Sequence, residues 1–271
     1  MLSYDQIMHF NAFGFLKIPG LFSVGEIGQI MSHSQEMFSR DIPGYDGTKH
    51  VNISNVLDRS PLLTELLDDD RLHCIPEGII GPDFIYHGSG AHRHVGDTPW
   101  HGGVGSIVKW PIRHIKVSMY ADSLNEHNGC LRVIPGSHRN YLRMLDTRWS
   151  MAPDYIDIIR YGRFQADDFR PFGLAPTEVP YFPLRTEPGD VLVHTEDILH
   201  ASFGGAPGRF QLDINFIDNP IEDEHINFMK SRNVYVKGEF NPSANLVNSD
   251  QPRIQRMVAR LIELGFETSK V

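Results

Sequence analysis

The sequence predicts a mainly β fold with helical cover (α+β), namely a double-stranded β-helix, the jelly-roll or cupin-like barrel. Helix-type patterns dominate approximately residues 1–80, and strand-like segments separated by turn residues fill 84–220. An amphipathic helix pattern returns at 250–268. No helix-length segments alternate with the strands, which disfavours parallel β-α-β winding. Residues 1–271 are therefore expected to form one domain.

The N-terminal part contains three predicted helix starts and one strand. Ser3 precedes a helical pattern, and residues 15–18 form a short strand closed by a Pro-Gly turn. Ser23 followed by Glu26 is a capping box, in which each side chain satisfies a backbone N–H of the other residue. It opens a second amphipathic helix. Pro61 at a first helical position predicts a third helix.

The barrel strands are predicted from short apolar or alternating runs that turn residues bound. These runs are 83–87, 107–110, 114–120, 129–133, 190–194 and 209–217. Residues 141–185 interrupt the pattern with aromatic and charged residues and prolines, and they are interpreted as an insertion or lid.

Composition excludes several classes of function. The net charge is −9, from 25 basic and 34 acidic residues, which argues against a general nucleic-acid-binding surface. Two cysteines are too few for a disulfide framework. No apolar run approaches a membrane span and no signal peptide is visible, so we expect a soluble, cytoplasmic protein acting on a small molecule. The oligomeric state is not indicated.

Two histidines far apart in the sequence form a candidate iron site. His101 stands in Trp-His-Gly-Gly, and His200 ends the segment 194–200. Non-haem Fe(II) oxygenases hold the metal with two histidines and one carboxylate, leaving the opposite positions open. A His-x-Asp motif would supply that carboxylate, but here the third position is Gly103, which has no side chain. A small anion could then occupy the vacant ligand position.

The sequence resembles the phytanoyl-CoA dioxygenase-like family of Fe(II)- and 2-oxoglutarate-dependent oxygenases along nearly its whole length. The resemblance is carried by residues 10–23, 128–139, 188–194, 200–202 and Arg209. It implies that His101 and His200 bind Fe(II), and that O2 is the oxidant. It also implies that Arg209 and Ser202 hold the distal carboxylate of 2-oxoglutarate, for which a guanidinium offers a two-donor fork.

Gly103 departs from the family pattern and resembles the His-x-Gly motif of the related halogenases. With no carboxylate on the metal, chloride or bromide can bind iron, and a substrate radical can collect halogen instead of oxygen. His101, Gly103 and His200 are therefore the candidate catalytic residues of a halogenase that chlorinates an unactivated C–H bond. Gly102 is interpreted as further reducing crowding at this opening.

Three alternatives stay open at this point. The chain could be a hydroxylase whose iron takes water in the third position, with Gly103 natural or introduced by exchange of aspartate. It could be a non-catalytic pseudo-enzyme that has lost iron. The carboxylate could also come from Asp97, which is expected to point away, or from Glu196, whose place before His200 does not fit the expected ligand order.

The substrate is predicted to be small and anionic, with a phosphorylated, nucleotide-like molecule as the candidate. The basis is the aromatic residues of the insertion, which could stack on a planar ring, and a local excess of basic residues near His101, namely residues 92–94, Lys109 and Arg113, with Arg139 and Arg143 as further candidates. Residues 114–120 alternate polar side chains on one face, which either lines the barrel or faces solvent. The candidate substrate-binding residues are His92, Arg93, Lys116 and Tyr120.

Overall fold

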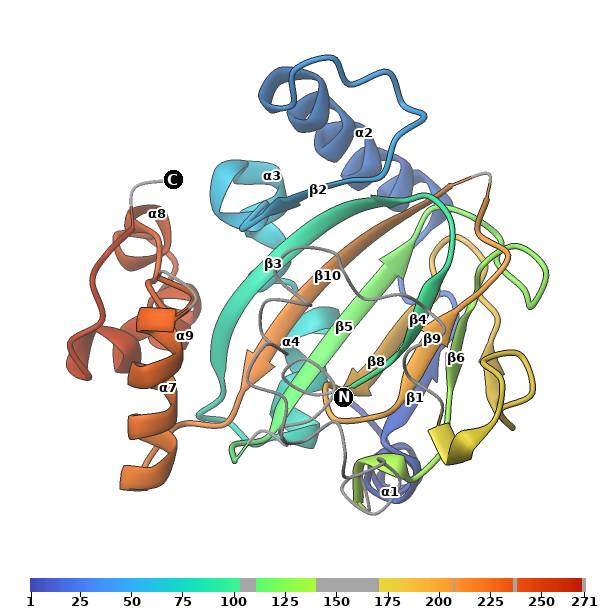
Figure 1. Cartoon of the computed structure of the whole chain (residues 1–271). Helices are drawn as coiled ribbons and strands as arrows, with labels where there is room; N and C mark the ends of the chain where they lie inside the picture. The colour runs from blue at the N-terminus through green and yellow to red at the C-terminus, as the bar shows by residue number, and fades with distance from the viewer. Residues whose placement is uncertain (103–110, 140–170, 207, 236–237, 270–271) are drawn as a thin grey trace.

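Two antiparallel sheets form the barrel in the computed structural model, which describes residues 1–102, 111–139, 171–206, 208–235 and 238–269 (Figure 1). One sheet has six strands in the order β1-β8-β5-β10-β3-β2, and the other has four in the order β4-β9-β6-β7. This arrangement confirms the predicted jelly-roll. The strands are β1 (Phe15–Ile18), β2 (Val51–Ser54), β3 (Ile85–His94), β4 (Thr98–His101), β5 (His114–Tyr120), β6 (Leu131–Val133), β7 (Phe182–Leu184), β8 (Val191–Thr195), β9 (His200–Ser202) and β10 (Arg209–Ile217).

Helices cover the outer face of the six-stranded sheet and also lie beside one of its ends. They are α1 (Tyr4–Phe13), α2 (Val24–Asp41), α3 (Pro61–Thr64), α4 (Asp70–Ile79), α7 (Asp223–Tyr235), α8 (Ala244–Val247) and α9 (Pro252–Glu263). The capping box predicted at Ser23 is formed, with Glu26 N–H donating to Ser23 Oγ and Ser23 N–H to Glu26 Oε2. In Figure 1, α2 runs along the top of the view and α7, α8 and α9 lie together on the left.

The main apolar core lies between the outer face of the six-stranded sheet and helices α2, α3, α4 and α9. Ile115, Val117 and Met119 of β5 are fully buried there, beside Ile214 of β10. Burying one such side chain contributes roughly 1.5–3 kcal/mol. The other face of the same strands is polar, because successive side chains of a strand point to opposite faces.

That polar face is turned into the barrel. In the β5–β10 register, Lys116 is opposite Asn215, Ser118 is opposite Asp213, and Tyr120 is opposite Gln211. Lys116 and Tyr120 both line an internal cavity. Of the two readings that the sequence left open for residues 114–120, the barrel-lining one is therefore confirmed.

Several predicted boundaries were wrong. The insertion placed at 141–185 extends too far, since β7 lies within it and pairs with β6. The strand predicted at 83–87 is the start of β3, which continues to His94. The C-terminal helix is shorter than 250–268 and ends at Glu263, just before Gly265 adopts a left-handed conformation with φ of 84°. The strand predicted at 107–110 lies outside the described residues.

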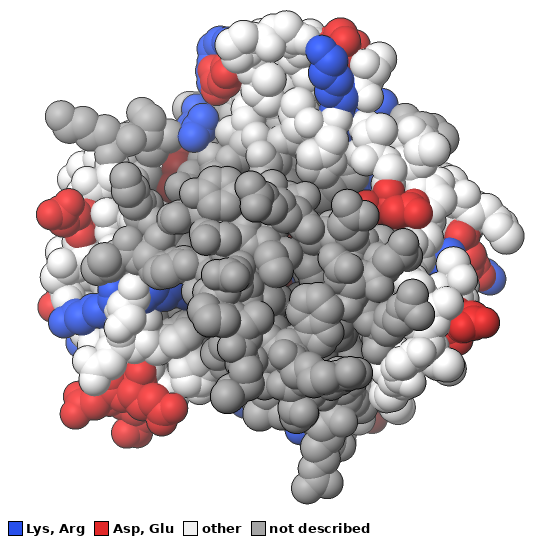
Figure 2. Space-filling view, in the orientation of Figure 1, with Lys and Arg blue, Asp and Glu red and all other residues white. Residues whose placement is uncertain are grey.

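The surface in Figure 2 carries both signs of charge. Among the described residues on that face, Lys and Arg side chains lie close to Asp and Glu side chains around the rim, rather than in a continuous basic tract. Within the described part of the chain, no helix combines the length and the apolar character needed to cross a membrane.

Candidate active site

His101 and His200 are brought together by the pairing of β4 with β9. The two residues are direct register partners, and their ring centroids lie 4.0 Å apart. Both lie deep in the fold, next to the fully buried Trp100, whose indole N–H donates to the Pro176 carbonyl at 2.9 Å. Two imidazoles separated by 99 positions in the sequence thus share one cavity.

Backbone carbonyls fix the orientation of both rings. His101 Nδ1 donates to the Pro99 carbonyl, and His200 Nδ1 donates to the Ile198 carbonyl, each at 2.8 Å. A carbonyl oxygen can only accept, so each Nδ1 carries the proton and each Nε2 keeps its lone pair. Burial lowers the pKa of both imidazoles and keeps them neutral. Neutral rings held in this way are suited to metal ligation.

Gly102 is required by close packing. A Cβ on Gly102 would lie 2.7 Å from the Ile198 carbonyl oxygen, in the turn that leads into His200. A side chain there would displace the turn and the histidine it carries. The idea that Gly102 also reduces crowding at the opening stays a prediction. Gly103 lies outside the described residues.

The two histidines open onto a cavity of about 110 Å³ inside the barrel. Its lining residues are His92, His94, Thr98, His101, Lys116, Tyr120, Leu131, His194, His200, Ser202, Arg209, Gln211 and Asp213. Among the predicted substrate residues, His92, Lys116 and Tyr120 line it. Arg93 does not, because alternation along β3 sends its side chain to the opposite face from His92.

Arg209 begins β10 and reaches into one end of this cavity. Its Nη1 donates to the Gly96 carbonyl at 3.1 Å, and its Nη2 donates to Thr98 Oγ1 at 3.2 Å. Burial lowers the pKa of its guanidinium, which is still a cation at neutral pH. Burial also raises the pKa of Tyr120 to about 12, so the phenol keeps its proton and remains a donor.

Ser202 lines the same end, but its hydroxyl is engaged. Ser202 Oγ donates to the Gly129 carbonyl at 2.7 Å and is buried. In this arrangement the hydroxyl can only accept a further hydrogen bond. The donors available to an anion at this end are therefore Arg209, Tyr120 and the hydroxyl of Thr98.

Asp213 and His92 form a close pair across β10 and β3. His92 Nε2 lies 2.5 Å from Asp213 Oδ1. Burial raises the pKa of Asp213, but the charge and hydrogen bond of His92 outweigh it and lower the pKa to about 2. Asn215 Nδ2 also donates to Asp213 Oδ2 at 3.1 Å. This carboxylate is committed to protein partners.

Lys116 and Glu196 form a second pair beside the histidines. Lys116 Nζ lies 3.2 Å from Glu196 Oε2, and the two side chains are 23% and 18% exposed. Lys116 is the register partner of His194, whose ring centroid lies 4.9 Å from that of His200. Burial disfavours both charges, but their mutual attraction outweighs it, raising the pKa of Lys116 and lowering that of Glu196.

The sequence matches the Phytanoyl-CoA dioxygenase (PhyH) family model over residues 10–206. The chain belongs to this family. The predicted resemblance is thereby confirmed at the level of the family.

Curated proteins similar to this chain include two ectoine dioxygenases. The one from Bordetella parapertussis is 28% identical over 163 residues, covering 52% of this chain and 51% of the relative. The chain thus spans about half the length of that relative. The one from Sphingopyxis alaskensis is 21% identical over 224 residues, covering 75% of this chain and 71% of the relative.

Solved structures with the same fold include HygX from Streptomyces hygroscopicus with nickel and 2-oxoglutarate bound. Its TM-score is 0.61 at 19% identity, over 80% of this chain and 87% of that chain. EvdO2 from Micromonospora carbonacea var. aurantiaca, complexed with 2-oxoglutarate, has a TM-score of 0.61 at 21% identity. The match covers 82% of this chain and 93% of that chain. At these identities the likeness concerns the fold.

Six of the residues that line the cavity were not among the predicted site residues. They are His94, Thr98, Leu131, His194, Gln211 and Asp213. A signal for two of them was present, because Gln211 and Asp213 follow Arg209 at alternate positions of the predicted strand and must share its face. Thr98 becomes a site residue only through its pairing with Ser202 across β4 and β9.

The predicted group of basic residues reaches the cavity only in part, since His92 and His94 line it whereas Arg113 and Arg139 do not. Arg113 Nη1 donates to the Ile79 carbonyl at 2.5 Å, and Arg139 Nη2 donates to the Asn11 carbonyl. Neither arginine lines the histidine cavity. Lys109 and Arg143 lie outside the described residues.

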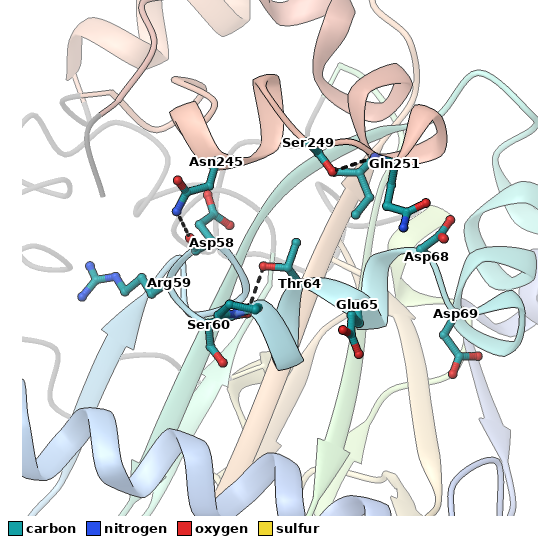
Figure 3. A pocket seen from close by; sticks show the side chains of 12 residues that line it. Asp58, Arg59, Ser60, Thr64, Glu65, Asp68, Asp69, Asn245, Ser249 and Gln251 are labelled. Atoms are coloured by element: carbon teal, nitrogen blue, oxygen red, sulfur yellow. Dashed lines mark hydrogen bonds between the residues drawn. The ribbon is translucent and has the colours of Figure 1, made fainter.

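A larger cavity of about 630 Å³ lies between the segment from Asp58 to Asp69 and the chain around α8 and α9 (Figure 3). It shares no lining residue with the histidine cavity. Its polar groups are paired locally, since Asn245 Nδ2 donates to the Asp58 carbonyl at 2.8 Å and Thr64 Oγ1 donates to the Ser60 carbonyl at 2.9 Å. We therefore assign the chemistry to the smaller cavity.

Proposed function

We propose that this protein is a non-haem Fe(II)- and 2-oxoglutarate-dependent halogenase that chlorinates an unactivated C–H bond of a small substrate. One observation carries the proposal. Two neutral imidazoles, His101 and His200, line one cavity with their Nδ1 atoms bonded to backbone carbonyls, while the residue two positions after His101 is glycine. Among the described residues, no three His, Cys, Asp or Glu side chains are grouped as a metal site.

His101 and His200 would hold the iron, and Arg209 would bind the distal carboxylate of 2-oxoglutarate with help from Tyr120 and Thr98. Ser202 would contribute an acceptor or packing rather than a donor, because its hydroxyl proton is committed to Gly129. With O2, the bound iron and 2-oxoglutarate supply the oxidising power to attack a C–H bond. The chain itself orients these groups and keeps them in a cavity of about 110 Å³.

Gly103 would leave the third ligand position to chloride. Two described carboxylates in or beside the cavity have other partners, Asp213 with His92 and Glu196 with Lys116. Chloride carries the same single negative charge as the carboxylate it would replace, so the net charge of the metal site is preserved.

For the substrate we propose a small anionic molecule of nucleotide type. The support comes from the sequence, in which Lys109 lies eight positions after His101 and Arg143 lies in an aromatic-rich segment. Arg113 and Arg139 do not contribute, because each donates to a backbone carbonyl elsewhere. The proposal for an anion therefore rests on Lys109 and Arg143.

The second candidate is a hydroxylase whose iron takes water at the third position. It is favoured by the curated relatives, which are named ectoine dioxygenases. The hydroxylase predicts an oxygen-containing product at any halide concentration, and a higher rate after Gly103→Asp.

Turnover of a panel of adenine nucleotides with Fe(II), 2-oxoglutarate, O2 and chloride tests the proposal. We expect a product with the isotope pattern of one chlorine, and succinate formed in proportion. Gly103→Asp is the matched control and should abolish chlorination. An oxygenated product at saturating chloride would favour the hydroxylase. Absence of 2-oxoglutarate consumption with every substrate, together with no iron binding, would support a non-catalytic protein.

A further inference from the structure

The Lys116–Glu196 ion pair is the feature of the cavity that the proposed function leaves unexplained. Two opposite charges are largely buried beside the metal histidines, where each alone would be costly. Such a pair is weak evidence for stability, because apolar residues of similar volume often serve a core equally well. Its position next to an iron site that lacks a carboxylate points to another role.

Glu196 is a carboxylate that lies beside the cavity of the metal histidines, because its partner Lys116 lines that cavity. It begins the turn between His194 and His200, with its backbone N–H donating to the His114 carbonyl at 3.1 Å. His194 also lines the cavity, and its ring centroid lies 4.9 Å from that of His200. The carboxylate is therefore carried by the short segment that joins two cavity-lining histidines.

Lys116 lies where it can bind that carboxylate away from the proposed iron position. It lies on β5, in the middle of the six-stranded sheet, and its side chain enters the cavity that His101 and His200 line. Its ammonium lies 3.2 Å from Glu196 Oε2. Ile115 and Val117 on either side are fully buried in the opposite core, so the backbone that carries Lys116 is fixed.

We propose that Lys116 is a positioning residue that holds the Glu196 carboxylate off the iron and thereby keeps the third ligand position open to halide. This inference rests on the proposed halogenase function. The physical reason is competition: a buried carboxylate without a partner is strongly disfavoured, and a divalent cation nearby is the alternative partner. While Lys116 is present, the carboxylate is already neutralised.

The test uses the full-length protein with Fe(II) and 2-oxoglutarate under anaerobic conditions, titrated with chloride while the visible metal-to-ligand charge-transfer band is recorded. In Lys116→Met, we expect Glu196 to take the iron position. The apparent chloride affinity should then fall by at least about tenfold, because the carboxylate competes for the same site. Lys116→Arg keeps a cation for Glu196 and should behave as wild type.

The double variant Lys116→Met/Glu196→Gln is the matched control. It removes both charges, so no carboxylate competes, and the chloride response should return. A merely structural ion pair would lower the stability of Lys116→Met but leave its chloride affinity unchanged, and that result would overturn the inference. If wild type itself gives the band without any chloride response, the proposed halogenase function fails instead.

Glu196→Gln alone provides a second measurement if Lys116→Met does not fold. Without its partner, the Lys116 ammonium is free to attract an anion, so chloride should bind more tightly than in wild type. An unchanged or weaker chloride affinity in this variant would contradict the inference.

Discussion

Strands β5 and β10 present two faces with opposite character. On the outer face, Ile115, Val117 and Ile214 are completely buried against the helices. On the inner face, Lys116 and Asp213 take part in charged pairs inside the barrel. The same strands thus supply the apolar core with one set of side chains and the candidate chemistry with the alternate set.

The inner face is tolerated because its polar groups have partners. His114 Nε2 lies 3.2 Å from Asn215 Oδ1, Asp213 is hydrogen-bonded to His92, and Lys116 is paired with Glu196. An unsatisfied buried polar group costs about 1–3 kcal/mol, so loss of one partner on this face should be costly. The two faces therefore predict different consequences for substitutions.

The largest expected effect is on metal binding. His200→Ala removes an imidazole whose Nε2 faces the cavity, and Fe(II) affinity should fall by more than about 100-fold. His194→Ala is the matched control, because that ring lines the same cavity but is not predicted to be a ligand. Metal titration by calorimetry measures both variants. Equal losses in the two would contradict the assignment of His200.

Arg209→Leu should weaken 2-oxoglutarate binding. It removes a buried guanidinium, and losing a charge-assisted hydrogen bond costs about 1.5–3 kcal/mol, or roughly 10- to 100-fold in affinity. Arg185→Leu is the control, since that arginine lies on the surface with a 66% exposed side chain. The charge-transfer band titrated with 2-oxoglutarate gives both affinities. Similar affinity in Arg209→Leu and wild type would place the co-substrate elsewhere.

A substitution on the outer face should lower stability without weakening 2-oxoglutarate binding. Ile214→Ala leaves a cavity in the main core and should lower the free energy of unfolding by about 2–4 kcal/mol. The 2-oxoglutarate affinity of the folded protein should stay near that of wild type. Urea unfolding followed by circular dichroism, together with the band titration, separates the two quantities. A large loss of affinity would show that the faces are coupled.

The smallest effect concerns pH. Burial lowers the pKa of His114 from 6.5 to about 4, so the folded state resists protonation while the unfolded chain does not. This histidine's contribution to stability is complete above pH 6.5 and is lost as pH falls from 6.5 towards 4. Within that window the slope is at most about 1.4 kcal/mol per pH unit. His114→Asn should flatten the stability–pH curve of the metal-free protein by that amount, measured by urea unfolding, and an unchanged curve would contradict the account.

Strand length alone did not decide which strands could be predicted, since the short β1 was predicted at its observed bounds while β3, with ten residues, was predicted only at its start. β5 and β10 match their predicted ranges because each alternates apolar and polar residues over seven or more positions. β7 is only Phe182–Leu184 and contains Pro183, which usually argues against a strand. α7 was missed because its sequence, Asp223–Tyr235, is largely polar and shows no clear apolar stripe.

In the candidate site, sequence motifs identified residues that line the cavity. Contacts that depend on how two strands are aligned could not be predicted from the sequence. His101, His200 and Arg209 stand in recognisable segments, and all three line one cavity. The pairing of Lys116 with Glu196 depends on how β5 aligns with β8, which no local pattern specifies. The same alternation that placed Lys116 inside the barrel excluded Arg93 from it.

The central claim is that the third iron position is open to halide. The most direct test records the anaerobic charge-transfer band of wild type with Fe(II) and 2-oxoglutarate, with and without chloride, beside Gly103→Asp. We predict that chloride shifts or strengthens the band in wild type and has no effect in Gly103→Asp, where a carboxylate fills the position. A wild-type band that does not respond to chloride would contradict the claim.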